Sequence, residues 1–526
     1  MNSEELEGEL RKGNDSFWEY RPPNGSWEDI ELGGLLGPTD LTTNISEYLG
    51  TLLEDCGFKV NIKYRQLAIN YLTELDPSSL NWHFYPGSWH SSGARYYQET
   101  LATIMYAGWM GYMPGGMVPD AEYRYGYEID GNFYGNRTLE RITKELYNVQ
   151  LNDTYEYWNK MVKTADLGLD QSVRIFLVTE YNFYPYDKDR IYHASTDVLT
   201  GWSDLFTPRT MRTADGTLTV AQYSSQNVLY RESWNELGGS DDINGQREKK
   251  MLMDQGSFIG PTNGKPIPMR TDWGDSGSNT KIEKDYSWEN GTLQKGIDVP
   301  SDAVIYNSSS NQWKEIGEDK RSAVKVTYKV VGGKWHSGAN LTLRDVMGWH
   351  AWSWDMAFED GADDPYYHRE FGRKKRSFFN NIVGEKWDEE NQTYTVWGDY
   401  TFPADSKIGH YYSIWPAVPY YQYQAAQFLV NQDESYIPNG IETYIWNEHE
   451  ADHWIDWLSK YQGENITETL QNMIDKDYTP WFMREENNAP IPVSQEDLNE
   501  EMQHLIDFYN EHEHLFASNG PFLLDN

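Results

Sequence analysis

The sequence contains a single cysteine and no long apolar run. Cys56 is the only cysteine among 526 residues, so the chain cannot form an internal disulfide. The segment around it, residues 52–57, has helical spacing, from which we predict a thiol buried in the core. No stretch approaches the roughly 20 consecutive apolar residues that a helix needs to span a bilayer. We therefore expect a soluble chain.

The amino terminus lacks the apolar stretch of a secretory signal. Residues 1–12 are mostly charged or polar, so they cannot form the hydrophobic centre of such a signal. We expect either that a signal has been removed or that the protein is not exported.

Positive charge is scarce. The chain has 44 Lys and Arg residues against 82 Asp and Glu residues, which gives a net charge of −38. Such a surface repels phosphate backbones, so nucleic acid is not expected as a partner. The one notable basic run, residues 373–376, lies in a polar stretch, and we predict a solvated loop there.

Aromatic residues, by contrast, are abundant. The 22 Trp and 39 Tyr residues are more than a core of this size usually requires. Their flat faces stack on ligands and their edges form hydrogen bonds, which suits sugars, peptides and the walls of a binding cleft. For about two thirds of them, core packing remains the simpler expectation.

Ten Asn-x-Ser/Thr sequences are potential acceptors for N-glycosylation. They favour an exported glycoprotein, although a chain rich in Asn, Ser and Thr also forms such triplets by chance. The acceptors are Asn14, Asn24, Asn44, Asn136, Asn152, Asn290, Asn307, Asn340, Asn391 and Asn465.

The first part of the chain alternates between strand and helix patterns. Residues 30–36 are mostly apolar, 41–53 have helical spacing and 58–64 alternate strictly, which predicts two parallel strands joined by a helix. The pattern changes near Thr210, where we place a lobe boundary. We also expect helices over 67–75, 96–106 and 139–165, and strands over 80–89 and 173–178.

The second part begins with a strand pattern over 217–221 and a stretch from 238 to 290 that is rich in Gly, Asp, Asn and Ser. Residues 323–331 then alternate and end at two glycines, which predicts one arm of a hairpin. Helical spacing recurs over 343–358, 420–430, 448–460 and 495–514. We therefore predict an α/β fold with an irregular amino-terminal segment, 1–28, and two lobes, 29–210 and 211–526.

Several catalytic templates are missing. The sequence has no phosphate-binding loop of the Gly-x4-Gly-Lys-Ser/Thr type, no dinucleotide fingerprint and no Gly-x-Ser-x-Gly elbow. Carboxylate pairs such as Asp355 with Glu359, or Glu389 with Glu390, occur in glycoside hydrolases, but spacing along the chain does not fix the separation that this chemistry needs. No catalytic residue and no cofactor is predicted.

One metal-binding pattern is present. His449, Glu450 and His453 have the His-Glu-x-x-His spacing that, on a helix, places two imidazoles on one face for zinc and leaves the glutamate as a base. A zinc metallopeptidase is therefore an alternative function. We favour a chance match on a solvated helix, because the chain is rich in acidic residues, and predict no metal site.

Three segments have the same order and character as segments of one protein family. Residues 324–329 and 334–346 contain a strand, a Trp-His-Ser-Gly turn, Leu-Thr and then Asp-Val. Residues 45–62 contain a helix that ends in Cys-Gly-Phe before a strand, and 511–522 end in Asn-Gly-Pro-Phe. Together they resemble the bacterial extracellular solute-binding family 5, whose members usually carry Asp where this chain has Ser337.

Three residues of the first segment have physical roles in this resemblance. Gly338 permits the tight turn, Thr342 caps the next helix, and Val346 packs that helix on the strand. The resemblance implies a two-lobed periplasmic-binding-protein-like fold of type II, similar to cluster C. The order departs from the family, because 45–202 resemble its carboxyl-terminal lobe and 218–522 its amino-terminal part. We therefore expect a permuted chain or a piece of a longer one.

The resemblance also implies a function. The chain is expected to capture oligopeptides or oligosaccharides for an ABC permease, without catalysis, at the cell surface or outside the cell, held by an anchor that this sequence does not contain. The implied ligand-binding residues are Trp82, Tyr85, Trp89, Trp109, Tyr112, Tyr181, Tyr184, Trp234, Asn235, Trp352 and Trp415. A structural cell-surface subunit with a borrowed binding fold is a further alternative.

The sequence leaves the ligand class open. Peptide-binding members often have an acidic residue after a Gly-Trp segment, which pairs with the peptide amino group. Residues 108–114 offer none, a loss of ~1.5 to 3 kcal/mol for a charged terminus, which favours an uncharged oligosaccharide. Asp120 is a possible substitute, so we retain both classes.

Overall fold

The computed structural model describes most of the chain. The described residues are 8–36, 40–64, 82–87, 93–110, 126, 128–129, 132–133, 135–172, 174–177, 179, 183–202, 207–219, 235, 237, 249–274, 281–361, 364–446 and 453–525. They contain both helices and sheets, which confirms the mixed α/β class. Among them, no helix combines the length and the apolar character that a bilayer crossing requires.

The chain divides into two compact units. Unit 1 comprises Met1–His90, Gln98–Val149 and Tyr155–Glu180, and unit 2 comprises Ser91–Tyr97, Gln150–Thr154 and Tyr181–Asn526. Residues 181–210, which we assigned to the first lobe, thus group with unit 2. The lobe boundary itself stays a prediction.

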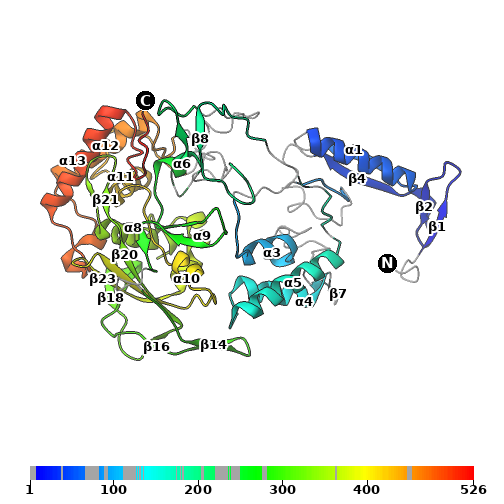
Figure 1. Ribbon diagram of the computed structural model, residues 1–526, viewed down its shortest axis with the longest axis horizontal. Helices are drawn as coiled ribbons and strands as arrows, with labels where there is room; N and C mark the ends of the chain where they lie inside the picture. Colours follow the sequence, from blue (N-terminus) through cyan, green and yellow to red (C-terminus); the bar gives the residue numbers. More distant parts are fainter. Residues whose placement is uncertain are drawn as a thin grey trace. The chain divides into compact units, whose positions relative to one another are not determined.

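Unit 1 begins with a small antiparallel sheet and the parallel crossover that the sequence predicted. Strand β4 (Glu31–Leu36) pairs in parallel with β5 (Lys59–Tyr64), and α1 (Asp40–Asp55) connects them and packs on both (Figure 1). The remaining elements of unit 1 are β1 (Glu9–Lys12), β2 (Trp18–Arg21), β3 (Glu28–Asp29), α3 (Glu99–Tyr106), η2 (Gly108–Met110), β6 (Glu128–Ile129), β7 (Asn132–Phe133), α4 (Arg137–Tyr147) and α5 (Thr154–Asp170).

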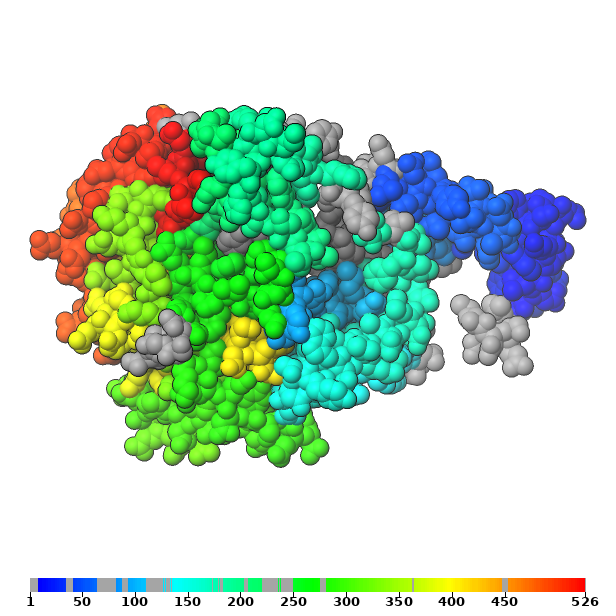
Figure 2. Space-filling model, viewed as in Figure 1, coloured from blue at the N-terminus to red at the C-terminus, as the bar shows by residue number. Residues whose placement is uncertain are grey.

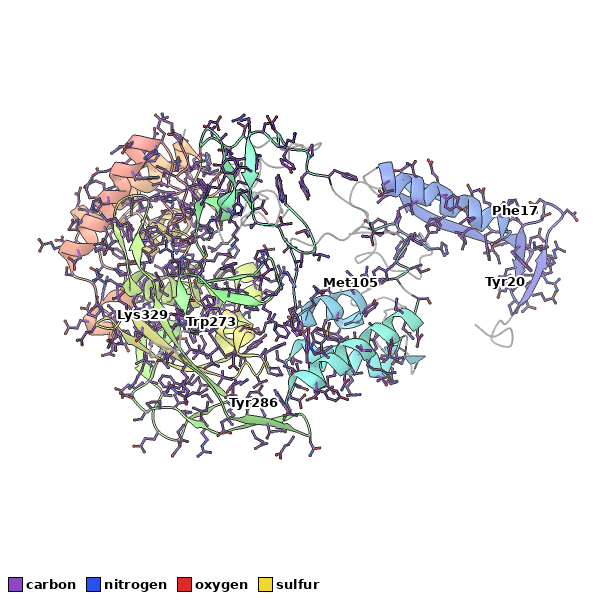
Figure 3. All side chains as sticks on the ribbon, viewed as in Figure 1. Phe17, Tyr20, Met105, Trp273, Tyr286 and Lys329 are labelled. Carbon is purple, nitrogen blue, oxygen red and sulfur yellow. The ribbon has the colours of Figure 1, made fainter. Side chains whose placement is uncertain are left out.

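Unit 2 is built on a seven-stranded antiparallel sheet. Its order is β12-β20-β24-β23-β17-β18, and β13 also pairs with β20. Strand β20 (Val324–Val330) alternates between buried and half-buried side chains, so its pattern follows the two-residue period of a strand with one face in the core. Tyr328 stacks on Tyr394 at 4.6 Å and meets Trp273, labelled in Figure 3, edge to face. The other strands of this sheet are β12 (Thr271–Asp272), β13 (Ile282–Lys284), β17 (Val304–Asn307), β18 (Gln312–Glu315), β23 (Ile382–Asp388) and β24 (Thr393–Gly398).

Two buried helices lie at the centre of unit 2. Helix α8 (Leu343–Ala357) and helix α11 (Tyr420–Asn431) pack against each other, and nearly every side chain of both is buried. The other helices are α6 (Thr207–Thr210), η4 (Ser308–Ser310), α9 (Arg369–Asn380), α10 (Asp405–Tyr411), α12 (Lys460–Asp475), η5 (Trp481–Met483), η6 (Glu485–Asn487) and α13 (Gln495–His512). The short strands are β8 (Ile191–His193), β9 (Arg212–Thr213), β10 (Ser257–Ile259), β11 (Pro266–Pro268), β14 (Tyr286–Glu289), β15 (Thr292–Lys295), β16 (Ile297–Asp298), β19 (Arg321–Ser322), β21 (Gly333–Lys334) and β22 (Asn340–Leu341).

Most long periodic segments fold as predicted. Helices α3, α4, α5, α8, α11 and α13 coincide with the expected ranges to within a few residues. Gly338 has φ +91° and Thr342 caps α8, so these two roles assigned to the 334–346 segment are confirmed. Val346 is fully buried, and its packing on the strand stays a prediction.

Several local predictions are wrong. Cys56 is exposed, because it lies beyond the last turn of α1. Residues 174–177 are not a strand, and their apolar side chains point to solvent. Residues 217–219 are not part of a strand either. Residues 373–375 of the basic run are exposed and Arg376 is half-buried, but the run lies on α9 and not in a loop, because Phe371 and Phe379 supply a buried face of that helix.

Two further errors concern turns and helices of unit 2. The two glycines after β20 do not turn the chain back onto β20, because β20 pairs with β24. The tight hairpin lies further on, where residues 335–339 join β21 to β22. The predicted helix 448–460 is absent over 453–459, where Trp454 forms a bridge with Ile445. The predicted helix over 67–75 lies outside the described residues.

The cap of α8 gives a first prediction. Thr342 Oγ1 accepts a hydrogen bond from the Arg344 backbone N–H at 3.2 Å, and Asp345 Oδ2 accepts one from the Thr342 backbone N–H at 2.9 Å. Thr342→Ala should lower the free energy of unfolding by about 0.5–2 kcal/mol, because it removes one half of this reciprocal cap. Urea denaturation measures the change, and Thr292→Ala, at an exposed position on β15, is the control. Equal stability of the two variants would contradict the role of the cap.

Candidate functional site

The predicted ligand-binding residues of unit 1 occupy two places. Trp82 and Tyr85 are half-buried in the segment 82–87, which runs beside β4 through a bridge between Gly34 and Phe84. Trp109 lies in η2, at the end of the described range 93–110. Trp89, Tyr112, Tyr181 and Trp234 lie outside the described residues, as does Asp120.

Trp109 is held by helix α4. Its indole Nε1 donates to Thr143 Oγ1 at 3.2 Å, and its ring meets Tyr147 edge to face at 5.1 Å. The ring is half-buried, so part of its surface remains open to solvent. Such an oriented aromatic face can stack on a sugar ring or an apolar side chain.

A buried carboxyl group lies next to Trp109 and was not predicted from the sequence. Glu140 is 6% exposed, its Oε1 accepts the backbone N–H of Gly108 at 3.0 Å, and its Oε2 has no hydrogen-bond partner among the described residues. Burial raises the pKa of Glu140 to about 7. Near neutrality the group is therefore partly protonated and can donate as well as accept. In the sequence alone, nothing distinguishes Glu140 from the other acidic residues of a predicted helix.

In unit 2, Asn235 serves the framework. Its amide Nδ2 donates to the carbonyl oxygens of Trp446 and Ile455, at 2.9 and 2.5 Å, and its Oδ1 accepts the Leu237 backbone N–H. The side chain is 1% exposed. In this conformation its amide is fully used in joining backbone segments and is not available to a solute.

Trp352 stands in a stack of buried rings. Its ring centroid lies 5.4 Å from that of Trp349 and 4.7 Å from that of Tyr423, with the ring planes nearly parallel. The ring of Trp446 meets it edge to face, with the centroids 5.8 Å apart. Trp352 is 1% exposed. The indole nitrogens of Trp352, Trp446 and Trp457 have no hydrogen-bond partner among the described residues, which is uncommon in a core. The structure thus brings Asn235 and Trp352 together through Trp446, but inside the core of unit 2.

Two predicted residues of unit 2 are more accessible. Trp415 is half-buried against a small apolar cluster formed by Trp335, Ala339 and Leu341. Tyr184 is 38% exposed, in the segment 183–190 that precedes β8. These two side chains remain candidates for ligand contact in the described structure.

The segment that resembles the solute-binding family is fixed to the carboxyl-terminal segment with the same resemblance. The His336 backbone N–H donates to the carbonyl of Ser518 at 2.7 Å, and His336 Nε2 donates to the carbonyl of Gly520 at 2.9 Å. Trp335 Nε1 donates to Asp345 Oδ1 at 3.2 Å, which links the turn to the start of α8. Two motifs more than 180 positions apart along the chain therefore form one structural block.

A buried ionic network extends this block. Asp254 receives hydrogen bonds from both Arg209 and Arg270, and its backbone N–H donates to Asn519 Oδ1 at 2.9 Å. Only 8% of its side chain is exposed. In Figure 2 the carboxyl-terminal residues, in red, border the green segment around residues 183–219, which includes Arg209. Nothing in the local sequence indicated this network, because its members lie far apart along the chain.

The alternative zinc site is only partly described. His449 and Glu450 lie outside the described residues, while His453 lies in an extended segment and not on a helix, with its Nε2 paired to Glu442. Across the part of the chain that the structure describes, no group of three His, Cys, Asp or Glu side chains is arranged to hold a metal ion.

Comparisons with known proteins found no protein-family model and no curated protein that matches this chain. The family resemblance therefore depends on the motif residues alone. The geometry of 335–346 and 518–520 is the structural basis on which a function can be argued.

Glu140 makes the stability of unit 1 pH-dependent. Its pKa is higher in the folded chain than its ordinary value of 4.5, so stability is greatest below that value and falls as the pH rises from 4.5 to about 7. Glu140→Gln should remove this loss and raise the melting temperature at pH 8 by about 2–4 °C relative to the parent chain. Calorimetric melting at pH 4.5 and pH 8 tests this, with the exposed Glu54→Gln as control. Parallel pH profiles for the parent and Glu140→Gln would refute it.

The burial of Trp352 predicts a large structural effect. Trp352→Ala should lower the free energy of unfolding by about 3–5 kcal/mol, because it leaves a cavity in the ring stack. Tyr461→Ala removes a side chain of α12 that is 59% exposed, and it should change the free energy of unfolding by less than about 0.5 kcal/mol. Denaturant unfolding followed by circular dichroism compares them. A mild Trp352→Ala variant with altered solute binding would instead place this ring in a ligand site.

Proposed function

We propose that this chain is an extracellular solute-binding protein that captures oligopeptides or oligosaccharides for an ABC importer by closure of two lobes. The ligand is bound and released unchanged. The observation that carries the proposal is the block formed by 335–346 and 518–520, because the two segments that resemble the family also pack on each other in unit 2. Unrelated chance matches would have no reason to meet in space.

The accessible aromatic side chains support the choice of ligand classes. Trp109 presents an oriented, half-buried ring, and Trp415 and Tyr184 are open to solvent to different degrees. Rings of this kind contact extended polar solutes through stacking and through hydrogen bonds at their edges. The acidic net charge of −38 also disfavours polyanionic solutes, which leaves peptides and neutral oligosaccharides.

The proposal includes a place and a partner. A binding protein of this type works outside the membrane and delivers its solute to a permease, so we propose an extracellular or cell-surface location. The ten acceptor sequences are in keeping with glycosylation there. The two-lobed periplasmic-binding-protein-like fold and the permuted order belong to the same proposal.

Titration calorimetry of the full chain against panels of oligopeptides and neutral oligosaccharides tests the function. One of the two classes should bind, with a negative heat-capacity change from the burial of apolar surface. A folded chain that binds neither class would overturn the proposal.

A pair of exposed tyrosines provides a matched test of the site. Tyr184→Ala should weaken binding of the solute found by calorimetry by about three- to tenfold, the amount expected for one aromatic contact. Tyr192→Ala, in the same part of unit 2 and 69% exposed, should leave the affinity unchanged. Both positions are open to solvent, so neither variant should unfold the chain. Equal affinities for the two variants would remove Tyr184 from the ligand site.

A further inference from the structure

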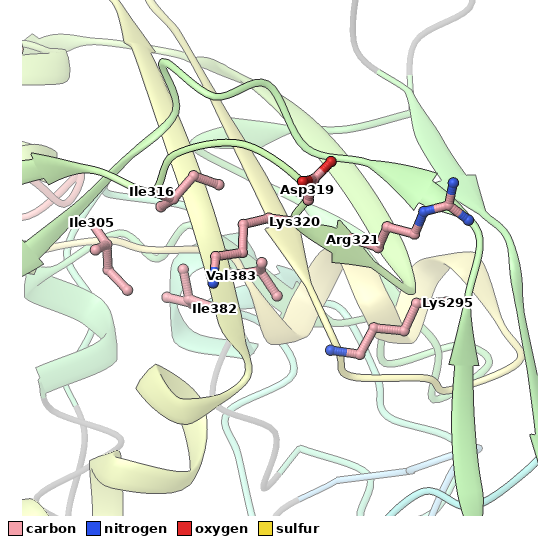
Figure 4. A pocket seen from close by; sticks show the side chains of 8 residues that line it. All are labelled: Lys295, Ile305, Ile316, Asp319, Lys320, Arg321, Ile382 and Val383. Atoms are coloured by element: carbon pink, nitrogen blue, oxygen red, sulfur yellow. The ribbon is translucent and has the colours of Figure 1, made fainter.

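A shallow hollow in unit 2 is lined by none of the described residues that were assigned to solute capture. It has a volume of about 680 Å³ and is lined by residues of β15, β17, β19, β23 and the loop before β19 (Figure 4). The lining side chains are Lys295, Ile305, Ile316, Asp319, Lys320, Arg321, Ile382 and Val383. Because the hollow is formed entirely within unit 2, its shape does not depend on how the two units are placed.

The floor of the hollow is aliphatic and firmly supported. Ile316 and Val383 pack against the buried cluster of Val299, Ala303 and Trp397. Ile382 is itself buried at the start of β23. Figure 4 shows the aliphatic side chains together on one side, with Lys295 and Arg321 on the other. An apolar group placed here would exclude water from a surface that the sheet already holds in position.

The rim of the hollow carries more positive than negative charge, in a protein whose net charge is −38. Three cations and one carboxylate, Asp319, line it. Lys295 Nζ lies 2.5 Å from Asp399 Oδ2, and Arg321 Nε lies 3.0 Å from Asp298 Oδ1, so these two cations already have partners. Lys320 is exposed and pairs with no carboxylate among the described residues. A ligand carboxylate would give it a charge-assisted partner.

We propose that this hollow binds a small organic carboxylate with an apolar body, such as an aryl- or branched alkyl-substituted acid. The apolar body lies on Ile305, Ile316 and Val383, and the carboxylate meets Lys320. A neutral molecule of the same shape would use only the floor, and an organic cation would be repelled by Lys320. The site is separate from solute capture, since none of the described residues proposed for capture lines it.

Methyl NMR of the full chain, labelled at the isoleucine δ-methyl groups, tests the site directly. The probe is 3-phenylpropanoate, and 3-phenylpropanamide is the uncharged control. Signals of Ile305, Ile316 and Ile382, assigned by conservative Ile→Val variants, should shift with the carboxylate and shift much less with the amide. Unshifted methyl signals at these three positions, or equal responses to the two compounds, would overturn the proposal.

Lys320→Gln supplies the second arm of the test. Its loss of charge should weaken 3-phenylpropanoate binding by about three- to tenfold, while the remaining isoleucine signals keep their positions and report an intact fold. Lys334→Gln removes an exposed lysine of β21 that does not line the hollow, and it should bind as the parent chain does. Equal affinities for the two variants would also overturn the proposal. Failure of either arm leaves the binding of peptides or oligosaccharides unaffected, so the two proposals are tested separately.

Discussion

The structure of unit 2 depends on the hydrogen bonds that join His336 to the carbonyl groups of Ser518 and Gly520. They connect the turn before α8 to the carboxyl-terminal segment around Ser518. The capping residue Thr342 and the buried Asp345 then fix the direction in which α8 enters the core. These few hydrogen bonds close a loop of more than 180 residues, and closing so long a loop is entropically costly. The first task of these motif residues is therefore to hold two distant segments together. Any role in binding depends on the fold that they stabilise.

Local features of this block could be predicted from sequence, and distant ones could not. The roles of Gly338 and Thr342 follow from backbone rules that operate within a few residues. Cys56 was misplaced because helical spacing gives no information about where a helix ends. The segment 174–177 has the composition of a buried strand but pairs with no strand among the described residues, and pairing is a property of the whole fold.

The candidate site shows the same limit for aromatic residues. Composition correctly indicated that many rings pack in cores, and Trp352 is one of them. It could not distinguish Trp352 from Trp109, whose ring is half-buried, because both occur in similar apolar surroundings along the chain. Glu140 and Asp254 were missed for a related reason. A carboxyl group becomes unusual only through burial or through partners that are distant in sequence.

The central claim is that two lobes close on a solute, and small-angle X-ray scattering tests it most directly. The full chain is measured alone and with a saturating peptide or oligosaccharide whose binding calorimetry has established. The account predicts a smaller radius of gyration in the presence of the ligand, as expected for hinge closure. An identical scattering curve with the ligand bound would contradict it.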